Sequence, residues 1–212
     1  MLKKRHEEIL AQAAKYENNV LGSQEHRQEL SFLNRTVQDF IKSVRLCEFA
    51  ATRWQEFGEC YLLPAYLDDI IEAALAAQLS IENGMLNPAR RELRFMLEVA
   101  VNIAYVDELR AKDSFADRTA FYRGKGVNKA NVDHVSELPL RMLPDNRESF
   151  ITSTRSAWVK GSNYVHLTKR RVDEKMALRE SGIGLGFETT EMIERISADV
   201  HEACSLVRRQ LA

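Results

Sequence analysis

Glycine, proline and cysteine are all scarce in this chain of 212 residues, and long apolar runs are absent. With 9 glycines and 4 prolines, the chain has too few turn residues for an all-β fold. The 3 cysteines, Cys47, Cys60 and Cys204, form no CxxC pair, so we expect reduced thiols rather than a disulfide framework or a zinc site. The longest apolar run, Ala73 to Ala77, is far shorter than the roughly 20 residues of a membrane span.

Composition and charge predict a globular cytoplasmic protein. Hydrophobic residues make up 45% and charged residues 29% of the chain, which excludes disorder and a membrane protein as the natural classes. The first residues carry a basic cluster followed by acids instead of an apolar core, so we expect neither a secretory signal nor a membrane partner. At this length we expect a single domain over residues 1–212 that folds without a metal ion or a disulfide.

The charges are distributed unevenly although the formal net charge is only −1. Residues 118–179 hold thirteen Lys or Arg against six Asp or Glu. A basic stretch of this kind attracts phosphate groups, so RNA is a candidate partner for this region. The alternative is that these cations form an ordinary solvated helix face.

Hydrophobic periodicity predicts an all-α fold, an antiparallel helical bundle of about six to eight helices. Residues 1–60 hold the N-terminal helices, and residues 61–212 form the main bundle, with an irregular connection over 124–144. Ser23, Asn87 with Pro88, and Asp145 with Glu148 are expected to start helices. The expected helices are 2–20, 23–57, 64–82, 88–111, 114–122, 145–160, 164–180 and 190–211.

Common enzyme signatures are missing. There is no HExxH, no Walker A loop and no GxSxG elbow. No histidine has a glutamate three residues before it, which argues against the di-iron pattern of helical bundles. We therefore expect neither a cofactor nor a metal site.

The most apolar helix carries a polar row. Arg94, Glu98 and Asn102 are spaced four residues apart, so they share one helix face inside the segment from Leu93 to Val106, which we expect to be buried on most sides. A buried arginine and carboxylate must be paired or hydrogen-bonded. The row is either a structural ion pair between helices or part of a polar site, to which Lys160 and Ser162 would also belong.

Two histidine patterns follow. Ser162 and His166 lie where a helix is expected to restart, and Lys160 precedes His166 by six residues. His166 is either a packed core histidine or a neutral base near a helix N-terminus. On the last helix, Arg195 and His201 form an Arg-x5-His pattern that could supply a phosphate-binding cation and a base.

These patterns together resemble the bacterial branch of the HEPN-like all-helical proteins (higher eukaryotes and prokaryotes nucleotide-binding). The resemblance covers roughly residues 60–180 and rests on Arg94-x3-Glu98-x3-Asn102-x2-Tyr105 and Ser162-x3-His166. It implies a helical bundle that is usually a homodimer. Active members are metal-independent endoribonucleases, often toxins or antiphage factors, with an Arg-x4–6-His motif at the dimer cleft. It thus implies His166, Arg195 and His201 as catalytic residues.

Two functions follow from the sequence. In the first, the protein binds RNA and cleaves it without a metal ion, because RNA supplies its own 2′-OH nucleophile and needs only a base and a cation on the phosphate. In the second, the protein is a non-catalytic helical module that binds a protein partner, and the polar row is structural.

Overall fold

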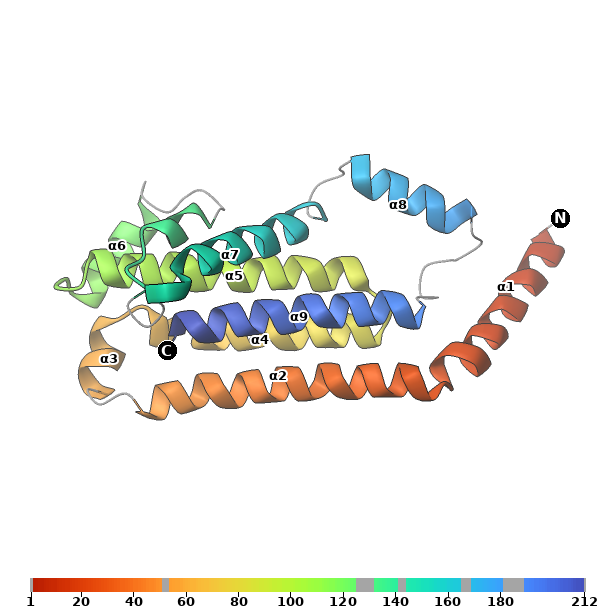
Figure 1. Ribbon diagram of the computed structural model, residues 1–212, viewed down its shortest axis with the longest axis horizontal. Helices are drawn as coiled ribbons and strands as arrows, with labels where there is room; N and C mark the ends of the chain where they lie inside the picture. The colour runs from red at the N-terminus through yellow and green to blue at the C-terminus, as the bar shows by residue number, and fades with distance from the viewer. Residues whose placement is uncertain are drawn as a thin grey trace.

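The computed structural model describes residues 2–50, 54–124, 132–140, 144–164, 169–180 and 189–211. Within these ranges the chain forms helices and no strand, which confirms the all-α prediction (Figure 1). The elements in chain order are α1 (Leu2–Tyr16), the π-helical turn η1 (Glu17–Leu21), α2 (Gln24–Ala50), α3 (Trp54–Cys60), α4 (Leu63–Glu82), α5 (Leu86–Leu109), α6 (Phe115–Arg123), the 3-10 turns η2 (Asp133–Ser136) and η3 (Pro144–Asn146), α7 (Arg147–Ser162), α8 (Lys169–Glu180) and α9 (Thr190–Leu211).

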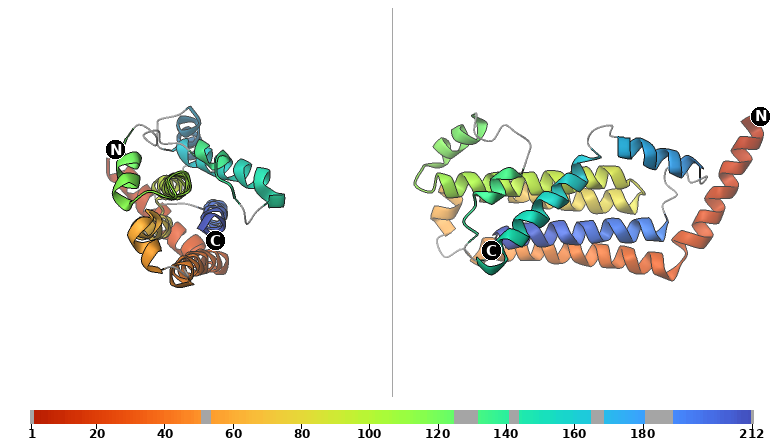
Figure 2. Two further views of the ribbon diagram at one scale, coloured as in Figure 1. Left: turned by 90° about the vertical axis from the view of Figure 1, so that its left-hand side faces the viewer. Right: turned by 45° about the horizontal axis from the view of Figure 1, so that its top comes forward.

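Five long helices, α2, α4, α5, α7 and α9, form the bundle, and α1 and α8 lie outside it at one end (Figures 1 and 2). α4 and α5 form an antiparallel hairpin, and Gly84 turns the chain between them with a left-handed φ of 68°. α9 runs in the same direction as α2 and α5 (Figure 1), with His201 level with Phe32 of α2 and Gln210 donating to the carbonyl of Ala100 of α5. The bundle therefore combines antiparallel neighbours with two parallel pairs.

Of the side-chain caps predicted for the helix starts at Ser23, Asn87 and Asp145, only the first is observed. The Ser23 hydroxyl accepts the N–H of His26 at 3.1 Å, as predicted for the start of α2. The caps predicted at Asn87 and Asp145 are wrong. α5 begins earlier, after Met85, and α7 follows Asn146, and neither start has a side-chain cap hydrogen bond. Burial of their apolar faces stabilises these helices instead of local capping.

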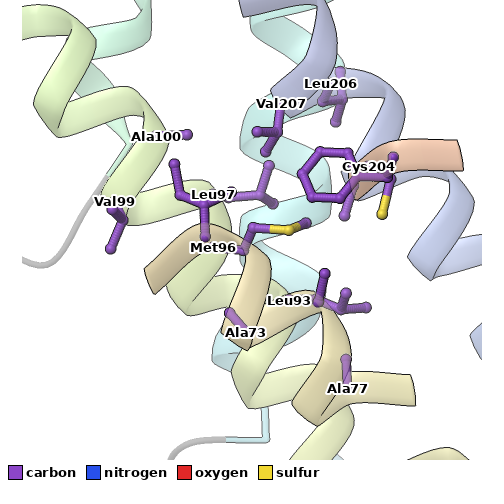
Figure 3. Close-up of a cluster of buried hydrophobic side chains, with 14 of the residues drawn as sticks. Ala73, Ala77, Leu93, Met96, Leu97, Val99, Ala100, Cys204, Leu206 and Val207 are labelled. Atoms are coloured by element: carbon purple, nitrogen blue, oxygen red, sulfur yellow. The ribbon is translucent and has the colours of Figure 1, made fainter. Parts of the chain in front are cut away.

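α5 lies at the centre of the core. Figure 3 shows its Leu93, Met96 and Leu97 meeting side chains of α4 and α9, among them Ala73 and Val207. Small alanines on α4 allow a close helix approach, and each large buried side chain contributes roughly 1.5–3 kcal/mol. The segment Leu93 to Val106 is buried on most sides, as expected, and Phe95 is its one residue exposed to solvent. No helix of the described residues has an apolar stretch long enough to cross a membrane.

Candidate functional site

The polar row of α5 forms a closed cluster with α7. Arg94 donates from Nε to Oε1 of Glu98 at 2.8 Å, and Trp158 of α7 donates its indole N–H to the same oxygen at 2.6 Å. The guanidinium of Arg94 also lies over the Trp158 ring, 4.9 Å from its centroid. The Arg94 and Glu98 side chains are only 11% and 16% exposed. The expected pairing of these two residues is thus confirmed.

Close packing leaves little room beside this cluster. An added Cβ at Gly161 of α7 would lie 2.7 Å from Cβ of Arg94, so α5 and α7 are in direct backbone contact there. The nearby cavity between α5, α7 and α9 measures ≈ 10 Å³, enough for about one water molecule. The geometry favours the structural interpretation of the row.

The other predicted members of the polar row have separate roles. Lys160 turns away from Arg94 and donates to Glu202 at 2.8 Å and Asp199 at 3.3 Å on α9, which raises its pKa. Ser162 donates its hydroxyl to the carbonyl of Trp158. Asn102 is buried, and its Oδ1 accepts no hydrogen bond from the part of the chain that the structure describes.

The predicted catalytic pair on α9 is not brought together. Arg195 and His201 are six residues apart, which separates them by roughly 120° around the helix and about 9 Å along it. Arg195 pairs with Glu191 in the first turn of α9 at 2.5 Å. His201 instead faces α2, where its ring centroid lies 6.0 Å from that of Phe32. His166 lies outside the described residues.

An open groove of ≈ 350 Å³ runs between the parallel helices α2 and α9 beside His201. We call it the α2–α9 groove. Each helix contributes side chains at spacings of three, four and seven residues, so one face of each helix lines it. The lining residues are Phe32, Arg35, Thr36, Asp39 and Phe40 from α2, and His201, Cys204, Ser205 and Arg208 from α9.

The groove carries two arginines that form no ion pair with other described residues. These arginines, Arg35 and Arg208, are both exposed. The carboxylate of Asp39 lies 3.8 Å from Lys42. An imidazole with two guanidiniums therefore faces solvent in one groove, a combination suited to a phosphate group.

Cys204 does not supply a reactive thiol to the groove. Its side chain is buried, and burial raises its pKa to about 12. The thiol is therefore protonated near neutral pH, whereas nucleophilic cysteines are thiolates.

Sequence reasoning missed a buried ion pair at the opposite end of α5. Arg118 of α6 is fully buried, and it donates to the carbonyls of Cys60, Arg110 and Ala111 and lies 3.4 Å from Asp107. Asp107 in turn accepts the N–H groups of Leu62 and Leu63 at 2.9 Å at the start of α4. Burial raises the pKa of Asp107, and these N–H groups and Arg118 oppose the rise.

A second cluster that the sequence did not predict joins α5 to η2. The rings of Tyr105 and His134 stack at 4.1 Å with an interplanar angle of 15°. Glu137 accepts a hydrogen bond from Tyr105 and lies 3.5 Å from Nδ1 of His134. Burial, followed by the contact with Glu137, raises the pKa of Tyr105. The cluster holds the η2 turn against the bundle.

Several cations of the basic region 118–179 are occupied within the fold. Arg118 is buried, Arg147 donates to the carbonyls of Ser136 and Leu138, and Arg155 lies 3.7 Å from Asp133. Lys160 pairs with α9. The sequence signal for these internal roles was weak, because their partners are distant in the chain. Arg35 and Arg208 of the α2–α9 groove lie outside this region.

Comparisons with family models, with curated proteins and with solved structures found no match. In the described part of the chain, no group of three or more His, Cys, Asp or Glu side chains is placed to hold a metal ion.

Proposed function

We propose that the protein binds RNA in the α2–α9 groove and cleaves it there without a metal ion. The observation that carries the proposal is the grouping of His201 with Arg35 and Arg208 in one solvent-open groove, where neither arginine forms an ion pair with another described residue. Further support comes from the HEPN-like resemblance, whose Arg-x5-His pattern includes His201. In this proposal Arg35 and Arg208 bind the phosphate in place of Arg195.

The reaction needs only the substrate and these side chains. His201 takes the proton of a ribose 2′-OH, and the 2′-oxygen forms a bond to the adjacent phosphorus. The bond from phosphorus to the 5′-oxygen breaks, and that oxygen takes a proton from solvent. The products are a 2′,3′-cyclic phosphate and a 5′-hydroxyl. Arg35 and Arg208 stabilise the negative charge that develops on the phosphate oxygens.

The second candidate function is a module that binds a protein partner. It is favoured by Leu46 and Phe49 near the end of α2, which are 67% and 79% exposed. Apolar side chains in such positions suit a protein contact. In this second function, the charged side chains of the α2–α9 groove bind no RNA.

Incubation of the purified protein with total RNA in EDTA separates the two functions. The proposed function predicts cleavage to fragments with 2′,3′-cyclic phosphate ends, and loss of cleavage in His201→Gln. The matched control is His6→Gln, since His6 is an exposed histidine on α1 far from the groove. Equal cleavage by wild type and His201→Gln would contradict the role of His201. Absence of both cleavage and RNA binding would favour the protein-interaction module.

The proposal also includes the homodimer and the toxin or antiphage role that the resemblance implies. Size-exclusion chromatography with light scattering tests the dimer. Expression of wild type and His201→Gln in a bacterial host tests the toxin role, which predicts growth arrest with the wild type alone.

A further inference from the structure

Phe32 is an aromatic side chain at one end of the α2–α9 groove that is partly exposed to solvent. It is 38% exposed, whereas Phe40, two turns further along α2, is buried in the core. Its ring lies beside that of His201, at a tilt of 31°. A large apolar ring next to cationic groups in an open groove provides a surface on which a nucleobase can stack.

The order of the side chains along the groove fixes the position of the Phe32 ring relative to His201 and the arginines. Because α2 and α9 run parallel, Phe32 lies level with His201 at one end. Arg35 lies about one turn further along α2, and Arg208 about two turns further along α9. A nucleotide with its base on Phe32 would therefore have its ribose next to His201 and its phosphate toward the arginines.

Only an unpaired base can stack on the ring of Phe32. Bases in an RNA duplex are stacked on their neighbours and present only their edges in the grooves, whereas unpaired bases stack on aromatic side chains.

We infer that Phe32 is the nucleobase platform of the α2–α9 groove, and that it makes the groove selective for single-stranded RNA. The inference rests on the proposed function. Phe32 contributes binding affinity, and His201 acts on the ribose. Stacking on Phe32 is equally strong before and during the reaction, so its loss raises KM and leaves kcat nearly unchanged.

Fluorescence anisotropy with a labelled 2′-O-methyl RNA oligonucleotide tests the platform without cleavage, because the methyl group blocks the 2′-oxygen. The probe is measured as a single strand and after annealing to its complement. Phe32→Leu is expected to weaken single-strand binding by about 5- to 160-fold, the range for loss of one base stack, and to leave duplex binding unchanged. Phe32→Tyr keeps the ring and should retain wild-type affinity.

Phe49→Leu is the matched control, because Phe49 is an exposed phenylalanine on α2 outside the groove. Thermal melting of each variant checks the fold, which a substitution at the partly exposed Phe32 is expected to preserve. Equal affinity of wild type for the single strand and the duplex, or wild-type binding by Phe32→Leu, would overturn the platform and leave RNA binding intact. Failure of the wild type to bind either form would instead overturn the proposed function.

Discussion

Trp158 donates its indole N–H to Oε1 of Glu98 at 2.6 Å, and the same oxygen accepts a hydrogen bond from Arg94. A single carboxylate oxygen of α5 thus accepts hydrogen bonds from one side chain of α5 and one side chain of α7, and so links the two helices. Oε1 of Glu98 is satisfied by these donors, and the charge of Arg94 is balanced by Glu98 and by the ring of Trp158. The cluster stabilises the seam between α5 and α7.

Replacement of Glu98 should therefore destabilise the fold. Glu98→Ala removes the acceptor of both Arg94 and Trp158, and we expect a loss of about 3 kcal/mol, at the lower end of the range for breaking a buried pair because the side chains are not fully enclosed. Urea denaturation measures the change. The matched control is Glu191→Ala, which breaks a pair of the same spacing whose residues, Arg195 and Glu191, are 73% and 68% exposed.

Exposed pairs of this kind contribute little, so the control variant should unfold at nearly the wild-type urea concentration. A Glu98→Ala protein as stable as Glu191→Ala would show that the seam does not depend on this carboxylate.

Among the charged residues outside the α2–α9 groove, substitution of Arg118 should lower the free energy of unfolding most. Arg118→Leu leaves Asp107 buried without its cation, and it removes the donor to the carbonyls of Cys60, Arg110 and Ala111. We expect a loss of about 3–5 kcal/mol of unfolding free energy. The control is Arg123→Ala, which changes an exposed residue of the same helix. Similar stability of the two variants would contradict a structural role for the buried pair.

Stability should fall at mildly acidic pH because of His26. This histidine is buried in the first turn of α2, its Nδ1 has no hydrogen-bond partner in the described residues, and burial lowers its pKa from 6.5. As the pH falls through 6.5, the unfolded chain takes up a proton that the folded chain does not yet bind. The free energy of unfolding therefore decreases over the pH range just below this value.

Urea denaturation of wild type and His26→Leu at about pH 7.5 and pH 5.5 isolates this contribution, because the other histidines are common to both proteins. The wild type should lose more stability than the variant on acidification. His6→Gln, which changes an exposed histidine, should behave as the wild type. Identical pH dependence in wild type and His26→Leu would show that His26 titrates normally in the fold.

The helices were predictable because their signals are local. Apolar residues at three- and four-residue steps, such as Leu33, Val37 and Phe40, predict a buried helix face, and these residues are buried in α2. Likewise, α4 ends at Glu82, as the expected helix 64–82 does, and Gly84 then turns the chain. The start of α5 was misplaced because a cap is only one contribution to a helix boundary, and burial of Leu86 and Ala89 extends the helix past Asn87.

The sites were less predictable because they depend on which helices become neighbours. The spacing of Arg94 and Glu98 predicted their pairing, since residues four apart share a helix face. Nothing local indicated that Trp158, sixty residues away from Glu98, would complete the cluster. In the same way, the parallel packing of α2 on α9 brings Arg35 to the face of His201, and sequence spacing had paired His201 with Arg195.

The salt dependence of RNA binding tests the α2–α9 groove most directly. For a single-stranded RNA, each phosphate contact contributes about 0.7 to the slope of log affinity against log salt concentration. The double variant Arg35→Ala/Arg208→Ala should reduce the magnitude of the slope by about 1.4 and weaken binding at low salt. The control, Arg91→Ala/Arg123→Ala, removes two exposed arginines outside the groove and should retain the wild-type slope. An unchanged slope and affinity in the groove variant would contradict the assignment of the groove as the RNA site.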